Sequence, residues 1–336
     1  MSRRWWFALP LAAGAGVVSL FATGILPPGG AEPTGQSRPD AAAGSVQQSS
    51  PEASPSALAT SPSATATVTT TPSRTASKSP APSQSVRAQS VPSIARVPIS
   101  SVRIKAAVRS ATSRGYQAGV AVVDTSTGKL WVAGDYNDTF AAESVVKVFI
   151  ATRLLATRQL TGDTADTAYR MITQSDDGAA DALYGLAGGD EVVPWIAKHY
   201  GIPGLGSPPT KVGWWSNNHI TAVGMARFYA KVKADPLVWP WLSKAMHRAT
   251  EYGSDGTYQF FGLKQADRNA AIKQGWGQDD DDWAQASDFN STGYVNSDRY
   301  AVVILVKGPP WEYNSGTPAA VTRIAKTLMP GGVMRL

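Results

Sequence analysis

The chain has 336 residues and no cysteine, which excludes disulfide bonds, thiolate metal sites, a cysteine nucleophile and lipid attachment through a cysteine. Its formal net charge is +6, but residues 96–336 carry only +3 without a basic stripe, so nucleic acid is not an expected partner. Composition is uneven: Ser, Thr, Pro and Ala fill 45 of the 65 positions from 31 to 95, where Phe, Tyr and Trp are absent.

The first 30 residues carry the pattern of an export signal. Arg3 and Arg4 precede an uncharged run over residues 7–26, and twenty helical residues span about 30 Å, the thickness of a bilayer core. Positive charge before such a run keeps the N-terminus in the cytoplasm, so the body of the chain is expected outside. Residues 1–30 fit a cleaved signal peptide and a retained anchor equally well. We therefore expect an extracellular protein, secreted or anchored to the outer face of the cytoplasmic membrane, with membrane contact only through residues 7–26.

Residues 31–95 are predicted to form a disordered linker. The segment cannot bury enough apolar surface to offset its ordering entropy, and its repeated Ser-Pro, Thr-Pro and Ala-Pro steps favour extended backbone. Such a linker suits a domain that must reach across or through a cell wall. Residues 96–336 then form the folded domain, which is long enough for one sizeable core.

Hydrophobic periodicity divides residues 96–336 into helices and strands. A helix and a hairpin come first, helices fill the middle around a long loop at 201–218, and strands with one closing helix come last. This order predicts an α+β fold: an antiparallel sheet built from both ends of the domain, flanked by helices, with an inserted helical subdomain. A turn at 296–298 is expected to join the last two strands. The expected helices are 102–112, 144–155, 167–186 with a break at 175–177, 191–200, 221–232 and 317–328, and the expected strands are 116–123, 130–132, 270–276, 291–295 and 300–307.

Ser144 and Lys147 stand three residues apart at the start of one expected helix. Side chains with this spacing share a helix face, so the lysine amine can lie beside the serine hydroxyl. A serine hydroxyl needs a base to become a nucleophile, and a lysine can serve when burial or neighbouring cations lower its pKa. The helix N-terminus adds partial positive charge where an oxyanion would form. The plain alternative is a capping serine beside a solvated lysine.

Two further motifs follow in chain order. Ser175-Asp176-Asp177 is a polar break between helical segments, and Lys273-Gln274-Gly275 lies on an expected strand. A strand edge beside the nucleophile could bind a substrate amide as an added strand does. Lys211-Val212-Gly213 rivals the last motif but lies in the Pro- and Gly-rich loop. Lys273 is preferred because two strands and a closing helix follow it.

In this order the motifs resemble those of class A β-lactamases and penicillin-binding proteins. The resemblance covers residues 96–336, and the domain is similar to exported actinobacterial serine hydrolases of this class. It rests on residues 143–148, 171–177 and 272–276, together with the agreement between the family's layout and the expected elements. It implies a Ser/Lys acyl-enzyme mechanism without a cofactor.

The resemblance also implies roles for single residues. Ser144 would be the acylated nucleophile and Lys147 its base. Ser175 would relay a proton to the leaving group, and Lys273 would bind a substrate carboxylate and tune Ser175. The backbone N–H groups of Ser144 and Trp276 would form the oxyanion hole. The implied substrate-binding residues are Asp177, Gln274, Gly275 and Trp276, with a β-lactam or a cell-wall peptide as the candidate substrate.

Three departures from the family pattern bear on activity. Asp177 stands where the family has an amide donor, and a carboxylate cannot donate to a substrate carbonyl. Gln274 replaces the usual Thr or Ser. No Asp or Glu lies between Glu191 and Asp235, where the deacylating glutamate of class A β-lactamases would stand. We therefore expect poor deacylation of a β-lactam acyl-enzyme.

The alternative function is a catalytically inactive module of the same fold that binds cell-wall peptide or glycan, since a fold can outlive its chemistry. The three histidines lack metal-ligand spacing, and Asp279–Asp282 fits a solvated loop better than a cation site. We expect a monomer that holds no metal. Four tryptophans near expected site loops could stack on a ligand, although core or loop-clamping roles are commoner for this residue: Trp214, Trp215, Trp276 and Trp283.

Overall fold

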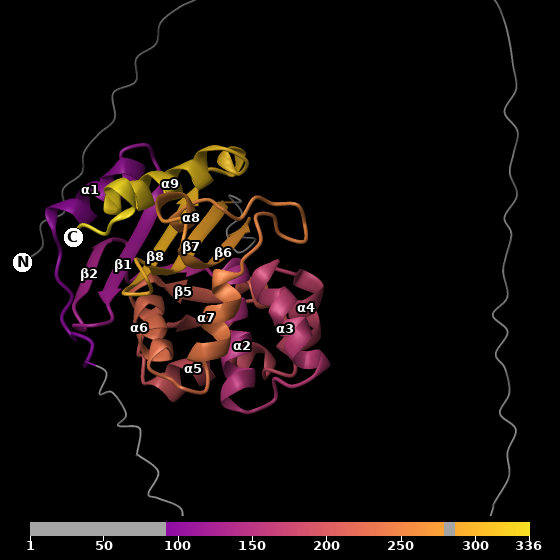
Figure 1. Cartoon of the computed structure of the whole chain (residues 1–336). Helices are drawn as coiled ribbons and strands as arrows, with labels where there is room; N and C mark the ends of the chain where they lie inside the picture. The colour runs from indigo at the N-terminus through magenta and orange to yellow at the C-terminus, as the bar shows by residue number, and fades with distance from the viewer. Residues whose placement is uncertain (1–91, 279–285) are drawn as a thin grey trace, which may run out of the picture. The chain divides into compact units, whose positions relative to one another are not determined.

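The five long strands form one antiparallel sheet, in which the strands that come first in the chain pair with those that come last (Figure 1). The computed structural model describes residues 92–278 and 286–336. The predicted sheet, assembled from both ends of the domain, is confirmed, with Val120 of one end opposite Ile304 of the other. In spatial order the strands are β2 (Leu130–Gly134), β1 (Gln117–Asp124), β8 (Tyr300–Gly308), β7 (Ser287–Val295) and β6 (Ala271–Gly277).

Both faces of the sheet are covered. In β1, Val122 belongs to the core beneath α1 (Val102–Thr112) and α9 (Gly316–Leu328), whereas Val123 belongs to the core beneath the helical part of the domain. A strand that is buried on both faces has an unbroken apolar sequence rather than an alternating one, as β1 does. Figure 1 shows α1 and α9 on one side of the sheet and α2 to α7 on the other.

The helical part lies between β2 and β6 in the chain and carries its own small antiparallel sheet, in the order β3-β5-β4. It contains the break that the sequence predicts near residue 175, between α3 and α4. Its elements are β3 (Thr139–Ala141), η1 (Glu143–Val146), α2 (Lys147–Ala156), α3 (Asp163–Thr173), α4 (Asp177–Tyr184), η2 (Gly189–Glu191), α5 (Val192–Tyr200), β4 (Gly206–Ser207), η3 (Trp215–Asn217), β5 (His219–Thr221), α6 (Ala222–Lys233) and α7 (Trp239–His247). The short helix α8 (Leu263–Ala266), which follows in the chain, packs on α9 instead. Two short turns of 3-10 helix flank α9 near the C-terminus: η4 (Pro310–Glu312) and η5 (Pro330–Gly332).

The helical part differs from the sequence-based expectation in several elements, among them α7 and the segment 201–218. The α7 helix was not predicted, because Pro240 near its start suggests a break, although proline fits the first turn of a helix. The expected loop at 201–218 is not wholly irregular, since it contributes β4 and η3. β4 and η3 are too short for hydrophobic periodicity to reveal them.

The β7 strand begins at Ser287, four residues before the predicted start. Ser287, Asp288 and Asn290 are polar and fully buried, so this half of the strand carries no apolar pattern. The turn after it agrees with the prediction, because Asn296 and its two successors all have positive φ angles and join β7 to β8.

Several predicted segments lie outside the described residues. These are the export signal in residues 1–30, the linker as far as residue 91, and Asp279–Asp282 with Trp283. Among the residues that are described, no helix has both the length and the apolar character needed to span a bilayer. Residues 92–278 and 286–336 all belong to one compact unit.

Candidate active site

Ser144 lies on a tight turn that leads straight into a helix. Glu143–Val146 form the 3-10 turn η1, and α2 begins at Lys147. Glu143 has a φ of 48°, a left-handed conformation that costs a non-glycine residue on the order of 1–3 kcal/mol. The sequence predicts a regular helix from Ser144 onward, so the 3-10 turn is a correction. In a 3-10 turn, side chains three residues apart eclipse one another, which places Ser144 over Lys147.

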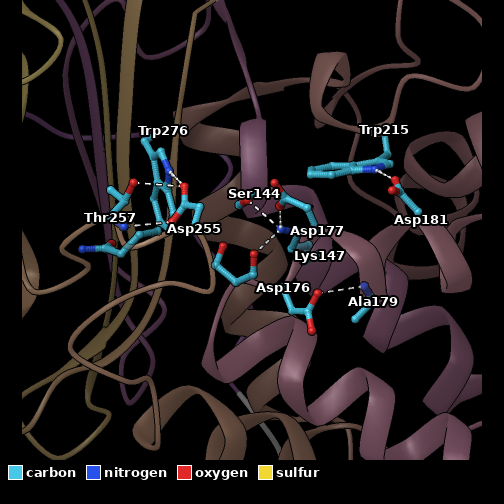
Figure 2. A network of polar contacts seen from close by, with 12 residues as sticks. Ser144, Lys147, Asp176, Asp177, Ala179, Asp181, Trp215, Asp255, Thr257 and Trp276 are labelled. Carbon is cyan, nitrogen blue, oxygen red and sulfur yellow. Dashed lines mark hydrogen bonds and ion pairs between the residues drawn. The ribbon is translucent and has the colours of Figure 1, made fainter. Parts of the chain in front are cut away.

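The Lys147 ammonium group is the centre of a buried polar network (Figure 2). Its Nζ atom lies 2.8 Å from Ser144 Oγ, 2.7 Å from the backbone oxygen of Ser175 and 2.5 Å from Asp177 Oδ1. The lysine side chain is fully buried, whereas the Asp177 side chain is 62% exposed. The ring of Trp215 covers the same ammonium group at 4.6 Å from the ring centroid. Lys147 therefore touches both the hydroxyl it could activate and a carboxylate that holds its proton.

A second lysine completes the network from the sheet. Lys273 of β6 donates from Nζ to Ser175 Oγ at 2.9 Å and to the Gln274 backbone oxygen at 2.8 Å, and it is 1% exposed. Ser175 stands in the break between α3 and α4 with a φ of 54°. Such strained conformations gather at functional sites. The structure thus brings Ser144, Lys147, Ser175 and Lys273 together.

Burial changes the acidity of both lysines. Burial lowers the pKa of Lys147, and the Asp177 carboxylate raises it again in part. Burial lowers the pKa of Lys273 much further, and the positive charge of Lys147 acts in the same direction. A lysine with a lowered pKa loses its proton more readily, which is what a base beside a serine needs.

A cavity of about 600 Å³ opens beside Ser144. Ser144 is 6% exposed and forms part of the cavity wall. The side chains around it come from η1, from α4, from η3 and the loop before it, and from the end of β6. They are mainly acidic and aromatic, and include Glu143, Asp177, Asp181, Trp214, Trp215 and Trp276.

The edge strand β6 packs directly on the turn that carries Ser144. A Cβ atom added to Gly275 would lie 2.7 Å from the backbone oxygen of Ala142 and 3.1 Å from the Val145 side chain. Only glycine lets the two backbones approach this closely. Gly275, which the sequence predicts to bind substrate, therefore also has a steric role in the packing of β6 on η1.

The Gly275→Ala variant is expected to lose about 1–3 kcal/mol of unfolding free energy, because the added methyl group meets backbone that cannot turn away. Urea denaturation measures the loss. Gly185→Ala is the matched control, since nothing lies within 4 Å of its added Cβ. Equal midpoints for the two variants would contradict the close packing of β6 on η1.

The side chains of Gln274 and Lys211, which belong to the two candidate lysine motifs of the sequence, both lie away from the buried network. Gln274 is fully buried and points away from the cavity: its Nε2 donates to the backbone oxygens of Gln259 and Phe261 at 2.9 and 2.8 Å. The structure does not bring it to a substrate. Lys211, the rival of Lys273, is exposed and stacks on Trp214 at 4.1 Å rather than joining the network.

The structure adds residues that sequence reasoning missed. Asp181 accepts from Trp215 Nε1 at 2.6 Å, and Asp255 accepts from Trp276 Nε1 at 2.9 Å (Figure 2). Hydrogen bonds from Thr257 and Trp276 outweigh burial and lower the pKa of Asp255. The one sequence signal for Asp181 is its position one helical turn after Asp177; Asp255 has none.

No arrangement of side chains for a metal was found in the described parts of the chain. Within residues 92–278 and 286–336, no group of three or more His, Asp or Glu side chains could hold a metal ion. The site is instead built from hydroxyl, amine, carboxylate and indole groups. Such a set is suited to acyl transfer through a serine.

Comparison with known proteins places the chain among β-lactamase-like folds. Residues 158–330, more than half of the chain, match the family model described as "Beta-lactamase enzyme family". The "Putative lipoprotein LppW" of Mycobacterium tuberculosis is 29% identical over 247 residues, covering 68% of this chain and 75% of the relative.

Two solved structures share the fold. A β-lactamase from Chitinophaga pinensis has a TM-score of 0.54 and 16% identity, covering 69% of this chain and 99% of its own. A mutant of PBP-A in an acyl-enzyme complex with penicillin G has a TM-score of 0.52 and 15% identity, covering 70% and 98%. At such low identity the likeness shows the fold alone.

Proposed function

The chain belongs to the Beta-lactamase enzyme family, and from this premise we propose that it is an exported serine hydrolase that forms an acyl-enzyme on Ser144. One observation supports the proposal most. The Ser144–Lys147 contact of 2.8 Å and the Ser175–Lys273 contact of 2.9 Å belong to one buried network beside an open cavity. β-Lactams or cell-wall peptides are the candidate substrates.

Acylation begins at the Ser144 hydroxyl. Lys147 Nζ, in its neutral form, accepts the hydroxyl proton while Oγ attacks the substrate carbonyl carbon, and the carbonyl electron pair moves onto oxygen. The backbone N–H groups of Ser144 and Trp276 would stabilise that oxyanion. Support for their proximity comes from the close packing of β6 on η1.

Collapse of the tetrahedral intermediate breaks the bond to the leaving nitrogen. Ser175 Oγ passes its proton to that nitrogen and takes up the proton that Lys147 had accepted, so that Lys147 is neutral again and the net change is transfer of the Ser144 proton to the leaving group. Lys273 donates to Ser175 Oγ and holds it in place. Because Lys273 is buried, its contacts support tuning of Ser175 more than direct binding of a substrate carboxylate.

Deacylation of a β-lactam adduct is expected to be slow. Between Glu191 and Asp235 the sequence offers no Asp or Glu that could activate a water molecule. Trp215, from this segment, instead lies over Lys147. The acyl-enzyme should therefore accumulate rather than turn over.

The test is intact-mass spectrometry of the full chain after incubation with a fluorescent penicillin. Wild type should gain the mass of one intact penicillin and hold the label through gel electrophoresis. The Ser144→Ala variant should gain none, because the attacking oxygen is gone. Labelling of both proteins, or of neither, would contradict the proposed mechanism.

A module that binds cell-wall peptide or glycan without chemistry is the second candidate. The observation that favours it is the 2.5 Å contact between Asp177 and Lys147, which stabilises the charged, non-basic form of the lysine. This candidate predicts wall retention that is unchanged by Ser144→Ala and no covalent adduct. Cell-wall sedimentation with both proteins separates the two candidates.

The proposal includes export through residues 1–30 and a linker over residues 31–95. The relative described as a lipoprotein supports a location outside the cytoplasm. This chain has no cysteine to carry a lipid, so its N-terminal segment would serve as signal or anchor. Fractionation of cells that express the full chain and a chain lacking residues 1–30 checks this, since only the full chain should leave the cytoplasm.

A further inference from the structure

The walls of the cavity beside Ser144 are both acidic and aromatic. Carboxylates of Glu143, Asp177 and Asp181 line it together with the rings of Trp214 and Trp215. No lysine, arginine or histidine occurs among the described residues that line this cavity. Carboxylates and indole faces are the two kinds of protein surface that attract a positive charge.

The stability of α4 explains Asp177 in part, because a carboxylate in the first turn favours a helix, but it does not explain Asp181. Asp177 and Asp181 lie one turn apart on one face and are both exposed. Like charges at this spacing cost a helix a few tenths of a kcal/mol, roughly. The cap of α4 is supplied by Asp176, whose side chain accepts from the Ala179 backbone N–H at 3.0 Å.

The cations nearest to these aspartates do not neutralise the cavity wall. Lys147, which is fully buried, pairs with one oxygen of Asp177, and the buried Lys273 contacts Ser175. Lys211, at the rim, stacks on Trp214. Within the part of the chain that the structure describes, Asp181 accepts a hydrogen bond from the neutral indole N–H of Trp215 and forms no ion pair, so its charge stays directed toward the cavity.

We propose that Asp177 and Asp181 make this cleft selective for acyl donors that carry a positively charged amine or guanidine near the reactive carbonyl. The inference rests on the proposed acyl-enzyme function and names its substrate class. The bound cation would lie against the two carboxylates, with the tryptophan rings beside it. A donor with a carboxylate in the same place would be repelled.

Three penicillins that share one nucleus test this directly. Ampicillin carries an ammonium group on its side chain, benzylpenicillin none, and carbenicillin a carboxylate. The acylation rate constant of the full chain is measured for each by quenched intact-mass spectrometry, at a pH where the ampicillin amine is protonated. We expect each step in this order to lower the rate about fivefold. The first step loses one exposed charge pair and one cation–π contact, and the second adds repulsion between like charges.

Two controls tie the order to the named residues. Asp181→Asn keeps the oxygen that accepts from Trp215 but loses the charge, so it should reduce the spread among the three penicillins. Asp138→Asn removes an equal charge from an exposed position outside the cavity and should leave the spread unchanged. Salt of about 1 M should also compress the spread, because it shortens the Debye length to about 3 Å.

The possible results distinguish failure of the proposed selectivity from failure of the proposed acyl-enzyme function. Failure of all three penicillins to acylate Ser144 would overturn the proposed function. Acylation of all three at equal rates, or fastest with carbenicillin, would leave the acyl-enzyme intact and overturn the selectivity. A spread that survives unchanged in Asp181→Asn would also contradict the proposal.

Discussion

The Lys147→Met variant is expected to acylate about 10²–10⁴-fold more slowly than wild type while folding at least as stably. The loss follows because the amine 2.8 Å from Ser144 Oγ is removed, and general bases contribute about this much to such steps. The stability follows because Lys147 is fully buried, and burial of an ammonium group is costly even when it is paired. Methionine has similar length and no charge. Asp177, which loses its partner, is 62% exposed and can be solvated.

The pH dependence of this stability difference has a defined sign. Because burial lowers the pKa of Lys147, the folded protein releases that proton at a pH where the unfolded chain still holds it. Unfolding takes up a proton in that range, so wild type gains stability as pH rises through it. The advantage of methionine is therefore largest at low pH and shrinks toward the ordinary pKa of lysine.

Urea denaturation at several pH values and acylation followed by intact mass measure the two effects. Lys211→Met is the control, because that exposed lysine stacks on Trp214 outside the network and should keep wild-type acylation. Wild-type acylation by Lys147→Met would remove this lysine from the mechanism. A large loss of stability would make its role structural.

The pairing of Ser144 with Lys147 could be predicted because it depends on local geometry. Residues three apart approach each other in a 3-10 turn as they do in a helix, so the error about the turn did not affect the contact. The preference for Lys273 over Lys211 also followed from local context, since two strands and a closing helix come directly after the strand that holds Lys273. Register then sets Lys273 opposite Thr292 within the sheet.

Long-range docking accounts for what the sequence could not predict. The contacts of Asp181 with Trp215 and of Asp255 with Trp276 join segments 34 and 21 residues apart. Neither α4 nor the loop that holds Asp255 contains a sequence pattern that predicts which tryptophan its aspartate contacts. The burial of Gln274 away from the cavity has a simpler cause, because neighbours on a strand face opposite sides and Lys273 already faces the site.

Asp177 is the departure from the family pattern that says most about the site, because the motif does not predict its contact with Lys147. The position was expected to contact substrate, yet its Oδ1 lies 2.5 Å from Lys147 Nζ. A carboxylate there raises the pKa of Lys147 and so opposes the burial that lowers it. The residue therefore controls how much neutral amine is available at a given pH.

The Asp177→Asn variant is expected to acylate benzylpenicillin about tenfold faster on the acidic side of its pH profile. Asparagine keeps an oxygen that accepts from Lys147 and adds an amide donor for substrate, but it removes the charge that raises the lysine pKa. In the proposed mechanism the neutral amine is the base, so a lower pKa of Lys147 moves the acidic limb of the acylation rate to lower pH. More neutral amine is then available at every pH below that pKa.

The profile is measured by quenched intact-mass spectrometry from acidic to alkaline pH, where the two proteins should converge once Lys147 is neutral in both. Asp138→Asn, which removes the same charge from an exposed position outside the cavity, should retain the wild-type profile. An acidic limb that moves to higher pH, or that does not move, would mean that Asp177 does not hold the Lys147 proton. Slower acylation at every pH would instead indicate that the Asp177 carboxylate takes part in acylation and that its negative charge is needed for the reaction.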